Sequence, residues 1–287
     1  MGDMSRIGVV GSGLMGSGIA EVCARAGLDV LVNEINTDAL EAGRGRITAS
    51  LARGVRSGKL SESDRDAALD RLTFTTDIGD FADRQLVIEA VAEHEPTKVE
   101  VFTALDKVVT SRDAIFASNT SSIPIMKLAM VTNRPEQVVG VHFFNPVPVL
   151  KLVELIPSLL TSEDTQARAR SFATDVLGKT VVRSQDRAGF VVNALLIPYL
   201  LSAIRMLESG FASAEDIDNG IVLGLAHPMG PLRLTDLIGL DTTKAVAESM
   251  YAEFKEPLYS PPPLLLRMVD AGLLGKKTGR GFYDYAH

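Results

Sequence analysis

The sequence predicts an α/β protein in which a doubly wound sheet with an inserted helical hairpin is followed by a smaller all-helical domain. Two observations support this class. In residues 1–186, short runs of Val, Ile and Leu alternate with helical patterns, as in β–α–β units with a parallel sheet. From residue 187 to 287, helical patterns punctuated by Gly and Pro replace the strand patterns. We therefore expect one domain over 1–186 and a second over 187–287.

The expected strands are short apolar runs that lie between helical patterns. They cover Arg6–Val10, Val30–Asn33, Leu72–Thr75, Leu86–Glu89, Ala114–Ser118, Val138–Phe143, Leu152–Ile156 and Thr180–Arg183. The segment of about residues 37–71 is too long for a single crossover helix, and it contains two helical patterns. We therefore expect a helical hairpin there, formed by Thr37–Ser57 and Ser61–Arg71.

Composition and charge exclude several classes of partner. Apolar residues make up 46% of the chain and aromatic residues 6%, as in a core of aliphatic side chains. The net charge of −7 gives no general attraction to nucleic acid or to an anionic membrane, so an anionic ligand needs a local basic patch.

The single cysteine, Cys23, excludes an internal disulfide and a cysteine-based metal cluster, and no metal is expected. Without a secretory leader or a membrane-spanning apolar stretch, the chain is expected to be cytoplasmic.

The longest apolar segment predicts a buried helix at the start of the second domain. Phe190–Leu207 is apolar around most of its circumference, although it contains Asn193, Pro198 and Arg205. A domain of this size buries only part of such a helix. We therefore expect a second subunit to cover the rest, which gives a homodimer through the C-terminal helical domain.

A glycine-rich motif follows the first strand. Gly11-Ser12-Gly13-Leu14-Met15-Gly16 matches G-x-G-x-x-G, with the strand IGVV before it and the helical pattern GIAEVCARAG after it. Gly11 permits a tight turn, Gly13 lets a pyrophosphate approach the backbone, and Gly16 lets helix and strand pack closely. The phosphates would meet the N–H groups at the start of the helix. In this context the motif predicts a dinucleotide-binding domain of the Rossmann type.

An acidic residue at the end of the second strand indicates which dinucleotide binds. Glu34 comes 23 residues after Gly11. A carboxylate there accepts hydrogen bonds from the adenosine ribose and repels a 2′-phosphate, which favours NAD over NADP. The alternative is a solvated carboxylate at a strand end, and Asn33 could share its role. We expect NAD as the cofactor.

Two polar residues lie in apolar strands, where packing does not explain them. His142 lies in VVGVHFFNP and Glu154 in LKLVELI. Either charge would be costly if it were buried alone, so the two strands are expected to bring them together. A histidine oriented by a buried carboxylate is a common proton acceptor near neutral pH. The alternative for His142 alone is a structural histidine in a strand.

A polar segment follows the strand AIFA. In Ser118-Asn119-Thr120-Ser121-Ser122, hydroxyl and amide groups come at the carboxyl end of a strand. In doubly wound sheets this edge faces the ligand. An ordinary polar turn is the alternative, since Ser and Asn are common in turns.

Seven segments resemble, in order and spacing, the 3-hydroxyacyl-CoA dehydrogenase family, and most of all its single-function bacterial members that act on 3-hydroxybutyryl-CoA. They are GSGLMGSGIA, IEAVAE, FASNTSS, VGVHFFNPVPVLKLVEL, GFVVNALLIPYL, HPMGPLRLTDLIGLD and GKKTGRGFY. The resemblance covers almost the whole chain, and HFFNPV with the following KLVE is highly specific. It implies NAD-dependent, reversible oxidation of (S)-3-hydroxyacyl-CoA, of short chain such as 3-hydroxybutyryl-CoA, to the 3-oxoacyl-CoA.

The resemblance also implies catalytic roles at matching positions. His142 would take the proton of the 3-hydroxyl group, and Glu154 would orient His142 and stabilise its imidazolium form. Ser121 and Asn193 would hydrogen-bond the 3-oxygen, and Asn145 would help to place substrate and nicotinamide. Independently, Asn193 is an amide in an otherwise apolar helix, where it needs a partner. A buried structural asparagine is the alternative.

For the cofactor, the resemblance points to Glu93, Lys98 and Lys277, together with the glycine loop, Glu34, Ser121 and Asn145. Glu93 follows the strand LVIEA at the ligand edge. Lys98 has the alternative of a charge on a helix surface. Lys277 belongs to the second domain, so that domain would have to close over the nicotinamide.

A basic stripe on the predicted hairpin is the candidate CoA contact. Ser50, Arg53 and Arg56 follow one another at i, i+3 spacing, with Lys59 just beyond. A local basic stripe on an acidic protein suits the phosphates of CoA. The family places CoA contacts on this hairpin, commonly with Lys where this sequence has Arg. A solvated helix face is the alternative for each residue.

Other functions remain open at this stage. The 6-phosphogluconate-type dehydrogenases also join a Rossmann domain to a helical one, but they use a catalytic lysine. A dehydrogenase of a free hydroxy acid or sugar acid could keep the same catalytic set. A non-catalytic NAD-binding structural protein, as in the lens λ-crystallins, is an alternative from a different class.

Overall fold

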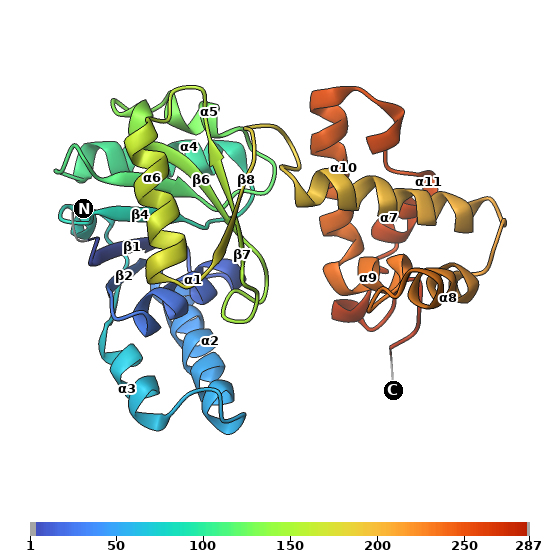
Figure 1. Ribbon diagram of the computed structural model, residues 1–287, viewed down its shortest axis with the longest axis horizontal. Coiled ribbons are helices and arrows are strands. Elements are labelled where there is room, and N and C mark those ends of the chain that lie inside the picture. Colours follow the sequence, from blue (N-terminus) through green and yellow to red (C-terminus); the bar gives the residue numbers. More distant parts are fainter. Residues whose placement is uncertain (1–3, 286–287) are drawn as a thin grey trace. The chain divides into compact units, whose positions relative to one another are not determined.

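The computed structural model describes residues 4–285, which form two compact units, one ending at Arg187 and the other beginning at Ala188 (Figure 1). The first unit contains one eight-stranded sheet with the order β3-β2-β1-β4-β5-β6-β7-β8. The order of its first six strands is that of a Rossmann-type sheet, so the predicted fold class is confirmed. The strands are β1 (Arg6–Val10), β2 (Asp29–Asn33), β3 (Leu72–Thr75), β4 (Leu86–Glu89), β5 (Ile115–Ser118), β6 (Val138–Phe143), β7 (Leu152–Pro157) and β8 (Thr180–Arg183).

The sheet is parallel from β3 to β6 and then reverses. Strand β7 pairs antiparallel to β6, and β8 pairs parallel to β7. The expectation of a parallel sheet is therefore wrong for the last two strands. The connection between β6 and β7, residues 144–151, contains no helix. A parallel crossover needs a dozen or more residues, so this short connection requires an antiparallel neighbour.

Helices cover both faces of the sheet and form the predicted hairpin. The hairpin helix α2 is capped by Asn36, whose side chain accepts from Ala39 N, and α3 is capped by Ser61. Gly58, with φ of +69°, lies in the turn between them. The helical elements of this unit are α1 (Leu14–Arg25), α2 (Thr37–Arg56), α3 (Glu62–Asp70), η1 (Ile78–Phe81), α4 (Glu95–Val108), α5 (Ile125–Ala129), η2 (Pro135–Gln137), α6 (Glu163–Ser171) and η3 (Phe172–Val176).

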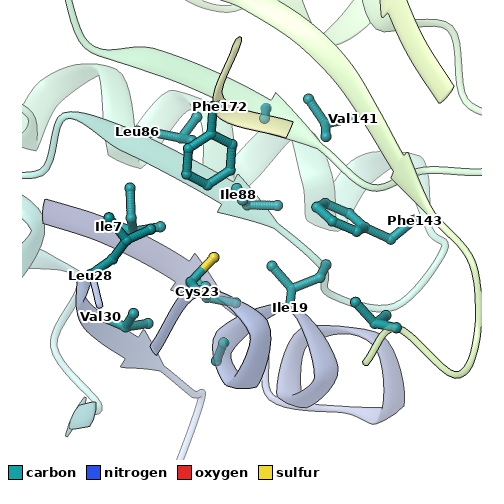
Figure 2. Close-up of a cluster of buried hydrophobic side chains, with 14 of the residues drawn as sticks. Ile7, Ile19, Cys23, Leu28, Val30, Leu86, Ile88, Val141, Phe143 and Phe172 are labelled. Carbon is teal, nitrogen blue, oxygen red and sulfur yellow. The ribbon is translucent and has the colours of Figure 1, made fainter. Parts of the chain in front are cut away.

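The main core lies between α1 and one face of the sheet. Figure 2 shows Ile7 of β1 and Ile88 of β4 pointing toward Ile19 and Cys23 of α1, with Phe172 completing the cluster. All five side chains are buried. Burial raises the pKa of the Cys23 thiol to about 12, so this cysteine stays protonated and unreactive. The core thus anchors α1, whose first turn follows the glycine loop.

Among the described residues of the second unit, helices are the regular secondary structure, and isolated β-bridges occur at Gly275, Arg280 and Asp284. Asp236 organises its C-terminal segment, because its carboxylate accepts from the backbone N–H groups of Phe282 and Tyr283. No helix among residues 4–285 is long and apolar enough to cross a membrane. The elements are α7 (Val192–Glu208), α8 (Ala214–Leu225), α9 (Pro231–Ile238), α10 (Leu240–Phe254), η4 (Pro257–Tyr259), α11 (Pro263–Asp270) and η5 (Lys276–Thr278).

Gly8 provides a test of packing on the second face of the sheet. A Cβ added to Gly8 would collide with the ring of Phe81, which is fully buried. We expect Gly8→Ala to lower the free energy of unfolding by about 1–3 kcal/mol, because the ring must move in a filled core. Urea denaturation measures the change. The matched control is Gly45→Ala in α2, where the added Cβ meets nothing within 4 Å. An equal effect of both substitutions would contradict the steric argument.

Candidate active site

The candidate base and its carboxylate face each other on neighbouring strands. Because β6 and β7 run antiparallel, His142 lies directly opposite Glu154 in the ladder. His142 Nδ1 lies 2.8 Å from Glu154 Oε2. The two residues are 6% and 0% exposed. The structure therefore brings together the two polar residues that packing did not explain, and each is the partner that makes burial of the other tolerable.

The segment after β5 places a hydroxyl group beside the same histidine. Ser121 Oγ lies 3.2 Å from His142 Nε2, on the side of the ring away from Glu154. Asn119 Oδ1 accepts from the backbone N–H of Phe143 at 2.8 Å, which ties this segment to β6. When the Nδ1 proton is donated to Glu154, a neutral ring presents the Nε2 lone pair toward Ser121. The site can therefore accept a proton at Nε2. The sequence pattern assigns Asn119 no individual role.

Glu93 holds the segment that carries Ser121. Its Oε1 accepts from Thr120 Oγ1 at 2.6 Å, from Ser121 N at 2.9 Å, and from Ser122 N and Oγ at 3.0 Å. Burial by itself would raise the pKa of Glu93, but Lys98 and these donors outweigh it, so the pKa lies below its ordinary value. Glu93 is therefore an ionised acceptor around which the segment is folded.

Lys98 is a buried charge between two carboxylates. Its side chain is 1% exposed, and Nζ lies 2.6 Å from Glu89 Oε1 and 3.3 Å from Glu93 Oε2. The alternative of a helix-surface charge is therefore wrong. Ser118 Oγ donates to the other oxygen of Glu89 at 2.6 Å. Sequence reasoning missed Glu89, although a carboxylate ending the apolar run LVIE is the same signal that singled out Glu154.

The glycine loop fits the phosphates of a dinucleotide. Gly11 has φ of +91°, and an added Cβ would lie 2.8 Å from Ala90 O, so only glycine fits there. Helix α1 begins at Leu14 with no side-chain cap and no acidic residue in its first turn. A Cβ on Gly13 would meet nothing within 4 Å, so the loop backbone faces open space. An anion can approach these N–H groups without repulsion.

Glu34 lies beside this loop. Glu34 Oε1 accepts from Ser12 N at 2.5 Å and from Ser12 Oγ at 3.1 Å. Asn33 instead bridges two strands, because Nδ2 donates to Thr75 O at 3.3 Å. The position of Glu34 at the end of β2 suits a ribose acceptor, and the loop and carboxylate together fit NAD.

A cavity of about 510 Å³ lies against α1, α2 and the β6–β7 connection. Ser50 and Arg53 of the hairpin and Asn145 of the connection all line it. Arg46, one more cation of α2, lines it too and donates from Nη1 to Ser12 O at 3.1 Å. Arg46 precedes Arg53 by seven residues, or two helical turns, which is the sequence signal that could have identified it.

Glu21 of α1 is a buried carboxylate on the wall of this cavity that sequence reasoning did not identify. Burial raises the pKa of Glu21, and the Ser50 hydroxyl, Arg25 and Arg53 reduce that rise. Glu21 Oε1 lies 3.4 Å from an Arg25 guanidinium nitrogen. A negative group thus lies on the wall of the cavity together with the cations Arg46 and Arg53.

The remaining predicted residues lie elsewhere. Arg56 is exposed and does not line this cavity, and Lys59 lines a separate one, so the hairpin divides the predicted basic stripe. Asn193 and Lys277 belong to the second unit. Asn193 lies in the first turn of α7. Lys277 Nζ lies 2.6 Å from Asp241 Oδ1.

These features define a class of enzyme. A glycine loop and strand-end carboxylate suited to NAD lie in the same unit as a histidine oriented by a buried carboxylate, with a serine hydroxyl at its other nitrogen. A dinucleotide with a nearby proton acceptor is the apparatus of a dehydrogenase that acts on an alcohol or a ketone.

Comparison with protein-family models identifies the family. Residues 6–187 match the 3-hydroxyacyl-CoA dehydrogenase NAD-binding domain, and residues 189–285 match the C-terminal domain of the same family. The chain belongs to the 3-hydroxyacyl-CoA dehydrogenase family, and it is an NAD-dependent dehydrogenase. The predicted family and cofactor are confirmed.

Individual relatives are similar over their whole length. The 3-hydroxybutyryl-CoA dehydrogenase of Mycobacterium tuberculosis is 64% identical over 282 residues, which are 98% of this chain and 99% of the relative. The crystal structure of (S)-3-hydroxybutyryl-CoA dehydrogenase from Ralstonia eutropha is 45% identical, with a TM-score of 0.94 and coverage of 99% and 100%. A diketoreductase that acts on dicarbonyl compounds is 30% identical, with a TM-score of 0.87 and the same coverage.

The lowered pKa of Glu93 predicts a pH-dependent contribution to stability. The group is more acidic in the folded protein than its ordinary value of 4.5, so its contribution is present above that pH. It declines as the pH falls below 4.5 and is lost as the pH falls through the lower pKa of Glu93 in the folded protein. We expect Glu93→Gln to lower the free energy of unfolding at pH 7. The difference in this free energy between the variant and the wild type should be smaller at pH 4. Urea unfolding at both pH values measures this, and a difference that does not depend on pH would contradict it.

Proposed function

We propose that the protein catalyses the reversible NAD-dependent oxidation of (S)-3-hydroxyacyl-CoA, with 3-hydroxybutyryl-CoA as a substrate and acetoacetyl-CoA as its product. The observation that carries the proposal is the set Glu154, His142 and Ser121, joined through the two nitrogens of one imidazole. The substrate named for the relatives from M. tuberculosis and R. eutropha supports the choice of acyl chain.

His142 acts as the general base. Glu154 accepts a hydrogen bond from Nδ1–H, which leaves Nε2 as the acceptor for the proton of the substrate's 3-hydroxyl group. The imidazolium that forms is stabilised by the Glu154 carboxylate, whose Oε2 lies 2.8 Å from Nδ1. Both side chains are buried, so water screens their electrostatic attraction only weakly. NAD, when bound, supplies the acceptor for the hydrogen on C3. In the reverse direction the imidazolium returns its proton to the 3-oxo oxygen.

Hydrogen-bond donors hold the reacting oxygen and the cofactor. Ser121, which Glu93 fixes through its backbone N–H, donates to the 3-oxygen. We assign Asn193 as a further donor to this oxygen, Asn145 to positioning of the substrate, and Lys277 to binding of the cofactor. In the structure the Lys277 ammonium lies 2.6 Å from Asp241 Oδ1.

The cavity against α1 and α2 provides the acyl-CoA groove. Arg46 and Arg53 on its wall attract the phosphates of CoA, whereas the overall charge of −7 would repel them. The diketoreductase acts on dicarbonyl compounds, so a similar scaffold serves a different substrate, and the groove distinguishes the CoA thioester from a free acid.

We also propose that two copies of the chain associate through the helical unit. Apolar side chains remain exposed there, including Phe211 at 78% and Leu223 at 81%. A cavity of about 360 Å³ lies between α7 and α8, and Met206 belongs both to it and to an adjoining cavity with Phe211. The Tyr199 hydroxyl is buried without a hydrogen-bond partner among residues 4–285. An apolar surface of this kind suits a self-complementary contact.

The first test of the function is oxidation of NADH in the presence of acetoacetyl-CoA. We expect turnover with this substrate, much weaker turnover with NADPH because Glu34 repels a 2′-phosphate, and none with free acetoacetate.

His142→Gln should lower kcat by about two to four orders of magnitude, since it removes the base. Glu154→Gln should also lower kcat, because an amide does not stabilise the imidazolium. Stopped-flow absorbance at the NADH band provides the measurement.

The matched control for the histidine is His94→Gln. His94 lies at the start of α4, where Nδ1 is 2.9 Å from Thr97 Oγ1, and it has no part in the proposed chemistry. Its kcat should equal that of the wild type. Absence of turnover with acetoacetyl-CoA would refute the function, and unchanged kcat in His142→Gln would refute the assigned base.

The dimer proposal predicts a change of mass in solution. The wild-type chain should sediment as a dimer, and Phe211→Asp should shift it toward the monomer, because a carboxylate is then desolvated at the contact. Sedimentation equilibrium measures both. The control is Leu159→Asp in the first unit, at a leucine that is 93% exposed. A monomeric wild type, or equal masses in all three proteins, would contradict the proposal.

A further inference from the structure

Glu89 is a buried carboxylate that no step of the proposed reaction uses. It ends β4 and is 0% exposed. Its Oε1 accepts from Val91 N at 2.7 Å and from Lys98 Nζ at 2.6 Å, and its Oε2 accepts from Ser118 Oγ at 2.6 Å. A carboxylate buried so completely is costly unless donors surround it, and these three donors belong to three different segments. Glu89 therefore joins the end of β4 to α4 and to β5.

The contact with Ser118 leads to the strand that carries His142. Ser118 lies beside Glu89 in the register of β4 and β5, and the N–H of the next residue, Asn119, donates to Glu89 O at 2.9 Å. Asn119 Oδ1 in turn accepts from Phe143 N at 2.8 Å. Phe143 follows His142 directly in β6, and both side chains are buried. The backbone beside the proposed base is thus tied to Glu89.

The contact with Lys98 leads to the hydroxyl group beside His142. Lys98 Nζ lies 2.6 Å from Glu89 Oε1 and 3.3 Å from Glu93 Oε2, so Glu89 is the nearer of these two carboxylates. Glu93 Oε1 accepts from Ser121 N at 2.9 Å. Without the nearer carboxylate, Lys98 would draw Glu93 toward itself and away from Ser121, because opposite charges attract strongly in a buried site.

The two paths from Glu89 end at the same contact. Ser121 Oγ lies 3.2 Å from His142 Nε2, the nitrogen that accepts the proton in the proposed reaction. One path reaches the histidine through Asn119, and the other reaches the serine through Lys98. A displacement of about 1 Å at a reacting group can lower a rate about 100-fold, so both ends need a fixed support.

We propose that Glu89 is a positioning residue for the reaction, which sets the Ser121 hydroxyl and His142 Nε2 in place relative to each other. The proposal rests on the proposed function, because it concerns the base and the hydrogen-bond donor of that function. Glu89 acts through Asn119 and Lys98 and not on the substrate itself. The value of kcat should therefore depend on Glu89, whereas KM for acetoacetyl-CoA should not.

Glu89→Gln tests this dependence by steady-state kinetics. The amide keeps the shape of the side chain, but it removes the charge beside Lys98 and replaces one acceptor by a donor. We expect kcat with acetoacetyl-CoA and NADH to fall about 10- to 100-fold, with KM for acetoacetyl-CoA changed less than about twofold. With NADH deuterated at the transferred hydrogen, the isotope effect on kcat should rise, because the chemical step is the one that slows. A kcat equal to that of the wild type would overturn the proposal.

The matched control is Asp106→Asn, which breaks another buried ion pair of the same unit. Asp106 Oδ1 lies 2.9 Å from Arg134 Nε, and these side chains are 5% and 3% exposed. Both substitutions should lower the urea concentration at the midpoint of unfolding, since each leaves a buried cation without its partner. Only Glu89→Gln should lower kcat. An equal loss of kcat in the two variants would show that Glu89 supports the fold alone.

Ser118→Ala cuts the path to His142 and leaves the charges of Glu89 and Lys98 in place. It should lower kcat about 3- to 10-fold, the effect of losing one buried hydrogen bond. Combined with Glu89→Gln, it should lower kcat by less than the product of the two single effects, because both substitutions remove the same contact. This variant tests the proposal even where Glu89→Gln does not fold. A kcat equal to that of the wild type, or single effects that multiply in full, would contradict the proposal.

Hydrogen–deuterium exchange separates this proposal from the proposed function. Mass spectrometry without substrate follows peptides that contain residues 119–122 and 142–144, where the two paths end. Deuterium uptake there should be faster in Glu89→Gln than in both the wild type and Asp106→Asn. Absence of turnover with acetoacetyl-CoA in the wild type refutes the function alone, and the exchange still tests the placement. Equal uptake in Glu89→Gln and the wild type would overturn the role of Glu89.

Discussion

The hydrogen bond between His142 and Glu154 depends on a reversal of chain direction, and much of the site depends on that contact. A parallel crossover would have required a long connection, whereas residues 144–151 turn back directly and set Glu154 opposite His142. The same connection packs on α1, where a Cβ on Gly18 would lie 2.8 Å from Val147. Pro148 lines both the cavity that Arg53 lines and the separate cavity that Lys59 lines. One short connection therefore sets Glu154 opposite His142 and contributes to the walls of both cavities.

A second group of charged residues, Lys98, Glu89 and Glu93, supports the segment beside His142. Lys98, buried between Glu89 and Glu93, allows two carboxylates to remain at the carboxyl edge of the sheet. Glu93 in turn accepts from the backbone N–H of Ser121, so the hydroxyl beside His142 is held by an ionised group. Breaking the buried pair of Lys98 and Glu89 would leave an uncompensated charge, so the network is costly to disrupt.

Much of the fold and part of the site could be predicted from local pattern. The G-x-G-x-x-G loop, the strand bounds and the hairpin depend on residues close together in the chain, where glycine, capping and periodicity act directly. Arg46 was missed because an exposed arginine on a helix is common, and only its spacing from Arg53 distinguishes it. Glu21 was missed because a glutamate in a helix carries no local sign of burial. Lys98 was open to interpretation as a surface charge for the same reason. Its burial is caused by two carboxylates that reach it from β4 and the segment beyond.

The sequence by itself determined the class of this protein. It showed a dinucleotide-binding loop after the first strand, and it showed two ionisable residues, His142 and Glu154, in apolar strands where each needs a partner. Those conclusions follow from short-range stereochemistry and from the cost of burying a charge. Only the tertiary structure decided the antiparallel pairing that aligns His142 with Glu154, the clamp of Glu93 on the Ser121 segment, and the two cavities along α1. These features depend on contacts between residues far apart in the chain, whose geometry no local pattern specifies.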